Sequence, residues 1–159
     1  MIALLDNTVL SNFTAIERPD LVRLALGSDA ATIEAAWGEL QAGVRIGRLP
    51  AQDWSWLPVL SLTEEEGSLC DHFSQYLNAG EAACLAAAIS RKGSRIFTDD
   101  RDARNMAGEW RVPVSGTLGI LLRLIDLHVL SLSEANALLS KMIAANNYRS
   151  PVDSLADLL

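Results

Sequence analysis

The sequence predicts an α/β fold with a mostly parallel central sheet. Strand-like apolar segments alternate with helix-like segments along the chain, which is the pattern of layered α/β domains. Residues 2–5 (IALL) and 94–98 (SRIFT) are short and largely apolar, as expected of strands buried on both faces. No internal repeat, low-complexity segment or linker interrupts the 159 residues, so we expect one domain over residues 1–159.

Helices are predicted in the first part of the chain by apolar residues at helical spacing and by capping residues. They cover residues 8–16, 18–26, 31–47, 63–77 and 78–93. Pro19 suits the first turn of the second helix, and Thr63 with Glu66 has the spacing of a capping box. Residues 56–62 are strand-like, and Pro58 favours an edge position because proline cannot donate a ladder hydrogen bond.

The second part of the chain continues the alternation. After the strand at 94–98 we expect a helix at 101–110, a short strand at 112–116 and helices at 117–127 and 131–147. Ser133 is the expected cap of the helix at 131–147. The tail predicts a last short helix, with Ser150 as its cap and Pro151 in its first turn.

Acidic residues follow two of the predicted strands. Asp6 comes directly after the first strand, and Thr98, Asp99 and Asp100 come directly after the strand at 94–98. Ligands of an open parallel sheet bind beyond the carboxyl ends of its strands, so these groups are expected at one edge. Gathered carboxylates raise each other's pKa values unless a cation lies between them, and hard oxygen ligands suit Mg²⁺ or Mn²⁺.

A purely structural interpretation of the same residues stays open. Asp6 and either Asp99 or Asp100 could cap the helices that follow them. Glu81 could stabilise the start of its helix through the helix dipole, and Glu39 could be a solvated residue of an amphipathic helix. Spacing alone does not choose between caps and a shared metal site.

The composition limits the class of protein. The formal net charge of −7 argues against a protein that coats nucleic acid passively, but not against an enzyme that meets phosphates through metal ions. Cys70 and Cys84 have the spacing of neither a disulfide framework nor a zinc site, so we expect a reducing, cytoplasmic compartment. We expect neither a signal peptide nor a membrane span.

Five segments in order resemble the PIN-domain nucleases. They are LLDNTVLSNF with Asp6, GEL with Glu39, GEAACLAAA with Glu81, FTDDRDAR with Thr98 and Asp100, and VPVSGTLGILLRL. The resemblance runs from residue 1 to about residue 130. It is nearest to the prokaryotic branch with VapC-like toxins and to predicted prokaryotic PIN nucleic-acid-binding proteins.

The resemblance implies a three-layer α/β/α sandwich with a divalent metal site. It assigns the catalytic and metal-binding positions to Asp6, Glu39, Glu81 and Asp100, and supporting positions to Thr8, Thr98 and Asp99. It implies Mg²⁺ or Mn²⁺ as cofactor and RNA as substrate. The chain departs from the family pattern in two places: Asn7 precedes Thr8 after the first acid, and Ala83 stands where relatives often have a second acid.

The leading functional hypothesis is therefore a metal-dependent endoribonuclease, a candidate toxin of a toxin–antitoxin pair, and a homodimer by analogy with relatives. Arg101 and Arg104 are candidate phosphate-binding residues, unless they pair with Asp99, Asp100 or Glu109. A non-catalytic PIN-like module that binds RNA or protein is the alternative. A phosphatase of the haloacid dehalogenase kind ranks lower, because that family wants an aspartate where Thr8 stands.

Overall fold

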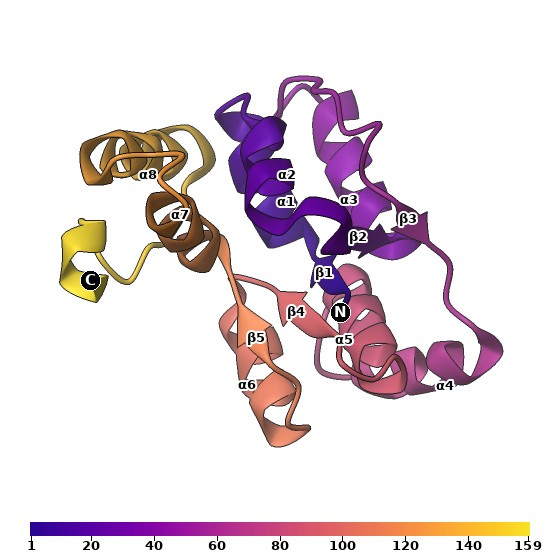
Figure 1. The fold of residues 1–159 in the computed structure, drawn as a ribbon. Coiled ribbons are helices and arrows are strands. Elements are labelled where there is room, and N and C mark those ends of the chain that lie inside the picture. The colour runs from indigo at the N-terminus through magenta and orange to yellow at the C-terminus, as the bar shows by residue number, and fades with distance from the viewer.

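The computed structural model describes residues 1–159, which form helices around a five-stranded parallel sheet (Figure 1). The strand order is β3 (Val59–Leu60), β2 (Ala30–Ile33), β1 (Ala3–Leu5), β4 (Arg95–Phe97) and β5 (Val114–Ser115). All four strand pairs are parallel. The predicted α/β class with a parallel sheet is therefore confirmed, as is the edge position of the strand after Pro58.

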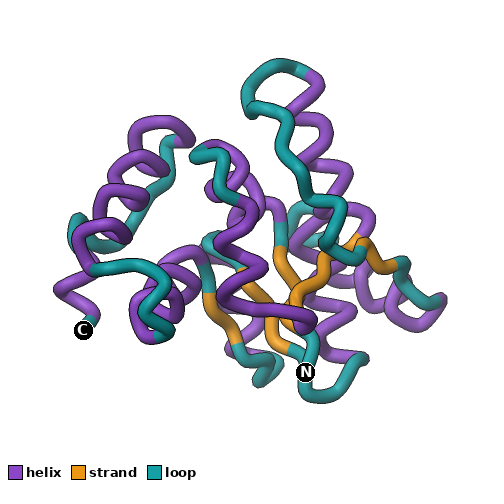
Figure 2. Tube along the Cα trace, turned by 45° about the horizontal axis from the view of Figure 1, so that its top comes forward, coloured by secondary structure: helices purple, strands orange, loops and turns teal.

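Helices cover both faces of the sheet, so the fold has three layers (Figure 2). One face packs against α1 (Asn7–Ala15), α2 (Pro19–Leu26), α7 (Thr117–Asp126) and α8 (Leu132–Asn146). The other packs against α4 (Glu64–Phe73), α5 (Ala79–Ser90) and α6 (Arg101–Glu109). Helix α3 (Glu34–Arg45) contributes to both cores, and short 3₁₀ helices lie at Gly27–Asp29 and Leu155–Leu158.

Alternation along the strands divides the core into two halves. In β1, Ala3 and Leu5 belong to the cluster under α1 and α7, whereas Leu4 belongs to the cluster under α5. Phe97 and Ile96 of β4 divide in the same way. Successive strand side chains point to opposite faces, so a strand buried on both sides is apolar on both, as Ala3–Leu5 and the pair Ile96 and Phe97 are.

Helix α5 is the helix most deeply enclosed by the rest of the fold. Every residue from Gly80 to Ala88 is buried, and the helix packs against α3, α4 and the sheet. Its small alanine side chains allow this close approach. The capping box predicted at Thr63 and Glu66 is present at the start of α4.

Three details of the sequence prediction are wrong. Residues 30–33 form strand β2, not the beginning of a helix; all four are buried, and the Thr32 hydroxyl donates to the Leu5 carbonyl at 2.7 Å. Helix α8 is capped by Ser131 and not by Ser133, because Glu134 lies three residues after Ser131 and completes a capping box.

The third correction concerns the tail. Ser150 and Pro151 precede the final turn and do not start it, since Ser154 caps the 3₁₀ helix at Leu155–Leu158. The Ser150 hydroxyl bonds instead to the backbone of Val152. Elsewhere, none of the helices combines the length and the apolar character that crossing a bilayer requires.

Candidate functional site

The sheet brings Asp6 beside the segment Thr98–Asp100. Leu5 and Phe97 are paired in the parallel ladder, and the Asp6 amide donates to the Phe97 carbonyl at 3.0 Å. Both strands end at this point: β1 continues into α1, and β4 continues into α6. The predicted meeting of these residues at the carboxyl edge of the sheet is what the topology produces.

Asp6 is almost completely buried, with 1% of its surface exposed. One carboxylate oxygen accepts from the amide and hydroxyl of Thr8, and the other accepts from the hydroxyl of Thr98. Burial raises the pKa of Asp6 to about 7, against the two threonine hydroxyls, which lower it; the charge of Asp99 raises it further. Asp6 therefore caps α1 and is also a buried carboxyl group whose charged form is disfavoured.

The two threonines connect the strand ends to each other. The Thr8 oxygen accepts from the Asp99 amide at 2.9 Å, and the Thr98 oxygen accepts from the Asp100 amide at 3.2 Å. Each threonine thus joins Asp6 to the loop that carries the other acids. Thr8 and Thr98 therefore hold the Asp6 carboxylate against the backbone of Asp99 and Asp100.

Glu81 lies in the first turn of α5 and is 6% exposed. It forms a capping box with Asn78, whose side-chain amide donates to Oε1 at 2.9 Å. Burial raises the pKa of Glu81 to about 7, and the negative charges of Asp100, Asp6 and Glu39 add to the shift. Four acids from four separate parts of the chain therefore act electrostatically on one region.

Glu39 and Asp100 each accept a hydrogen bond from a backbone amide in the first turn of a helix. Oε1 of Glu39 accepts from the Gly80 amide at 2.8 Å, and Oδ2 of Asp100 caps α6 by accepting from the Ala103 amide at 2.9 Å. Capping and clustering, which the sequence left as alternatives, thus occur together. Asp6 and Asp100 cap the helices that follow β1 and β4, so capping itself places both carboxylates at the carboxyl edge of the sheet.

Asp99 joins the sheet to α7. Its oxygens accept from the Thr117 amide at 2.8 Å, from the Thr117 hydroxyl and from the Asn12 side-chain amide at 3.1 Å. Burial raises the pKa of Asp99, while its bonds with Thr117 lower it. The Asn12 side-chain oxygen in turn accepts from Asn146 at 2.9 Å. Sequence reasoning missed Asn12, Thr117 and Asn146, although the first two lie within motifs that carried the resemblance.

The acidic side chains of the site meet only some of the requirements of a divalent metal ion. With these side-chain positions, no three Asp, Glu, His or Cys residues come together closely enough to hold a metal ion. Two features nevertheless fit one: the donors are all hard oxygens under mutual repulsion, and the side-chain oxygen of Asn7, next to Asp6, is buried without a hydrogen-bond partner. A cation would relieve the repulsion and satisfy such an oxygen.

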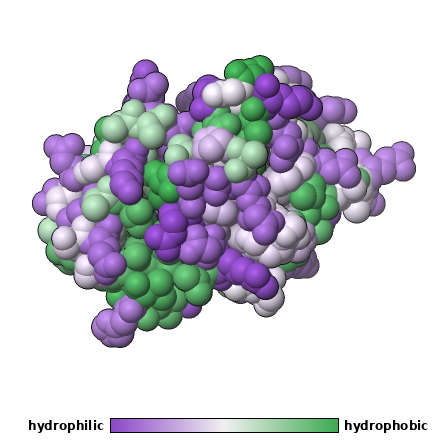
Figure 3. Space-filling view, turned by 90° about the horizontal axis from the view of Figure 1, so that it is seen from above, coloured by the Kyte–Doolittle hydropathy of each residue, from purple (hydrophilic) through white to green (hydrophobic).

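Arginines line the surface next to the acids. Arg101 and Arg104 of α6 form no ion pair with Asp99, Asp100 or Glu109; the ion pairs of the chain are Arg18–Asp20 and Arg91–Glu66. The predicted alternative of surface pairing is therefore not observed. Arg104 donates instead to the Thr98 carbonyl at 2.9 Å, beside the acid cluster. Seen from above, hydrophilic residues gather across the middle of the molecular surface (Figure 3).

Comparison with known proteins agrees with the fold. The family model described as "PIN domain" matches residues 2–159. No curated protein and no solved structure matches the chain significantly. PIN domains are generally nucleases that bind nucleic acid and typically use divalent metals. With the parallel three-layer sandwich and a match over nearly all of its residues, the chain belongs to the PIN-domain family.

Proposed function

We propose that the protein is a metal-dependent endoribonuclease whose site comprises Asp6, Glu39, Glu81 and Asp100. The observation that carries the proposal is geometric: the pairing of β1 with β4 brings Asp6 beside Asp100, and the Gly80 amide holds Glu39 next to Glu81. The charges of the other three acids, after burial, raise the pKa of Glu81 to about 7. Such a gathering of carboxylates, with Asp6 and Glu81 buried and Glu39 and Asp100 half-buried, is costly for a fold and is typical of functional sites. In this proposal the four carboxylates would hold Mg²⁺ or Mn²⁺.

The chain's own residues have separate tasks in this mechanism. Thr8 and Thr98 fix the Asp6 carboxylate between the two strand ends, and Asp99 holds the start of α7 against the site. Arg101 and Arg104 bind phosphates that flank the cut. When bound, a divalent ion supplies charge neutralisation at the phosphate and a more acidic water.

The test is cleavage of a mixed RNA pool in Mg²⁺ or Mn²⁺ by the wild-type protein and by Asp6→Asn. We expect metal-dependent cutting that the variant loses. Asp102→Asn is the matched control, because Asp102 is an exposed acid on α6 that the proposal leaves outside the site. Equal cutting by Asp6→Asn, or cutting in chelator, would reject the metal-site mechanism. Hydrolysis of small phosphate esters instead of RNA would favour the phosphatase.

A non-catalytic module is the second candidate, and one observation favours it. The acids of the site already have structural hydrogen bonds, and no ready ligand set is present. Ala83, where relatives often have an acid, is buried and contributes no donor. This candidate predicts RNA or protein binding with no cleavage under any metal.

The roles of toxin and homodimer are also proposals. Helix α7 offers little free apolar surface, since Ile120, Leu121 and Leu124 are fully buried, but Leu158 and Leu159 in the tail are 44% and 72% exposed. Growth arrest on expression, reversed by a protein encoded beside it, would support the toxin role. Light scattering of the purified protein tests the dimer.

A further inference from the structure

A hollow in the molecular surface lies next to the acid cluster. It has a volume of about 620 Å³ and lies between α6, the start of α7 and the segment that follows α8. Asp99, Tyr148 and Arg149 line it and also line a neighbouring polar hollow that contains Asp100. The two hollows therefore share a wall, and the larger one continues from the proposed cutting site.

Three arginines from two segments surround this hollow: Arg101 and Arg104 from α6, and Arg149 from the tail. None of the three forms an ion pair, and Arg101 and Arg149 make no side-chain hydrogen bond. Asp99 is the one carboxylate in the lining, and the charge of Arg104 acts on it, so the three arginines leave this hollow with an excess of positive charge in a chain whose net charge is −7. Guanidinium groups that form no ion pair within the protein are well suited to bind phosphate oxygens.

The same hollow has apolar and aromatic walls. Leu118 of α7, Pro151 and Leu158 line it, and the half-buried ring of Tyr148 separates it from the polar hollow. Burial, aided by the charge of Asp99, raises the pKa of the Tyr148 phenol above its ordinary value. The aromatic ring and the aliphatic side chains beside it offer a surface on which a nucleobase can pack.

We propose that this hollow binds one unstacked nucleotide of the substrate strand beside the cutting site, its base against Tyr148, Leu118 and Leu158 and its phosphates against the three arginines. The inference rests on the proposed endoribonuclease function, and it adds a subsite built largely by the C-terminal segment. A nucleotide held in this way is out of its stack, so the strand is unpaired at that position.

Binding can be measured without cleavage. The protein carrying Asp6→Asn is titrated, in chelator, into two labelled probes of equal charge: a hexamer of adenosine and an abasic ribose-phosphate hexamer. We expect the adenosine hexamer to bind about tenfold more tightly, since stacking on a protein surface contributes about 1–3 kcal/mol per base. Leu158→Ser should reduce this preference at least about threefold; Leu158 is 44% exposed, so the fold tolerates the change.

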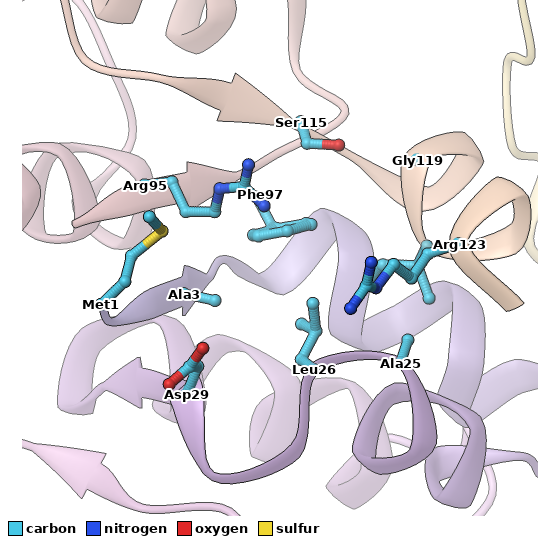
Figure 4. Close-up of a pocket in the computed structure, with 11 residues that line it drawn as sticks. Met1, Ala3, Ala25, Leu26, Asp29, Arg95, Phe97, Ser115, Gly119 and Arg123 are labelled. Atoms are coloured by element: carbon cyan, nitrogen blue, oxygen red, sulfur yellow. The ribbon is translucent and has the colours of Figure 1, made fainter. Parts of the chain in front are cut away.

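The arginines should act differently from the apolar residues. Arg101→Gln and Arg149→Gln are expected to weaken both probes by the same factor, because they contact phosphate. Arg123→Gln is the matched control: it removes one arginine from a different hollow of about 260 Å³, between α2 and α7, into which Arg95 and Arg123 point (Figure 4). This control should leave both affinities within about twofold.

Equal affinity for the two probes would overturn the proposal, as would an effect of Arg123→Gln equal to that of Arg101→Gln. Base preference that depends on Leu158 would support the subsite even if the wild-type protein cuts no RNA. Failure of the nuclease proposal is therefore distinguishable from failure of the subsite, which shows itself in binding alone.

Discussion

The backbone amide of Gly80 donates a hydrogen bond of 2.8 Å to Oε1 of Glu39. The contact joins the first turn of α5 to α3, and it places the Glu39 carboxylate next to Glu81. A Cβ atom at position 80 would lie 2.8 Å from both Glu39 oxygens, which is too close for either to remain. Glycine at this position is therefore a condition for the observed position of Glu39.

Gly80→Ala should impair RNA cleavage more than it impairs folding. The displaced group is the flexible end of a side chain, so the fold can adjust, but Glu39 must leave its position. We expect cleavage to fall about tenfold, which corresponds to about 1.4 kcal/mol of transition-state stabilisation, with an almost unchanged melting temperature. Gly38→Ala in α3 is the control, because its Cβ would meet nothing within 4 Å. Equal activity of both variants would show that Glu39 has no part in the chemistry.

Removing one charge from the acid cluster should not destabilise the metal-free protein. In Asp6→Asn and Asp100→Asn the new residue can still cap its helix, while repulsion within the cluster is relieved. We expect the melting temperature in chelator to stay constant or rise for both variants. A clear drop in both would mean that the carboxylates serve mainly as caps.

The metal-free protein should lose stability as the pH rises from 5 to 8. The pKa values of Asp6 and Glu81 are about 7 in the folded protein, against ordinary values of 3.8 and 4.5. The unfolded chain releases these protons first, so the contribution to stability is full below about pH 4 and is lost as the pH passes through 7. Urea unfolding at several pH values in chelator measures the slope, which should be smaller in Asp6→Asn.

The buried ion pair between Arg91 and Glu66 does not contribute to this pH dependence. Glu66 has a pKa lowered to about 2, chiefly by its hydrogen bond with Arg91, so it stays ionised throughout the range from 5 to 8. A stability that is flat over this range would contradict the raised pKa values of the cluster.

Arg91→Met should destabilise the fold without altering the site chemistry. The Arg91 guanidinium donates to both Glu66 oxygens, at 2.9 and 3.0 Å, and the Glu66 side chain is only 2% exposed. Removing the partner leaves a buried carboxylate unpaired, which we expect to cost about 2–3 kcal/mol of unfolding free energy. Arg18→Met breaks the exposed pair with Asp20 and should cost less than about 1 kcal/mol. Chemical denaturation measures both variants. Equal losses of unfolding free energy in Arg91→Met and Arg18→Met would contradict the claim that the burial of Glu66 makes its ion pair more important.

Much of the fold follows from local features of the sequence. The buried strands β1 and β4 are apolar at every inward position, and the box of Thr63 and Glu66 marks the start of α4. Strand β2 could not be separated from α3, because Ala30–Ile33 continues into the helix at Glu34 with no intervening breaker residue. Its pairing with β1 and β3 is a long-range interaction that overrides a helix-like apolar pattern.

The site divides in the same way. The positions of Asp6, Thr98 and Asp100 follow from the rule that parallel strands present their carboxyl ends at one edge. The bond between Gly80 and Glu39 depends on how α3 packs on α5, and no local pattern encodes it. The amides of Asn12 and Asn146, which connect Asp99 to α8, carry no charge and no distinctive spacing, so only the assembled structure identifies them.

The central claim is that acids from four parts of the chain form one anionic site able to bind a divalent cation. Paramagnetic broadening of backbone amide signals by Mn²⁺ tests it most directly. The account predicts selective broadening at Asp6, Gly80, Glu81 and Asp100 at low Mn²⁺, strongly reduced in Asp6→Asn. Broadening centred instead on the acidic start of α4 at Glu64–Glu66, or no selective broadening, would contradict it.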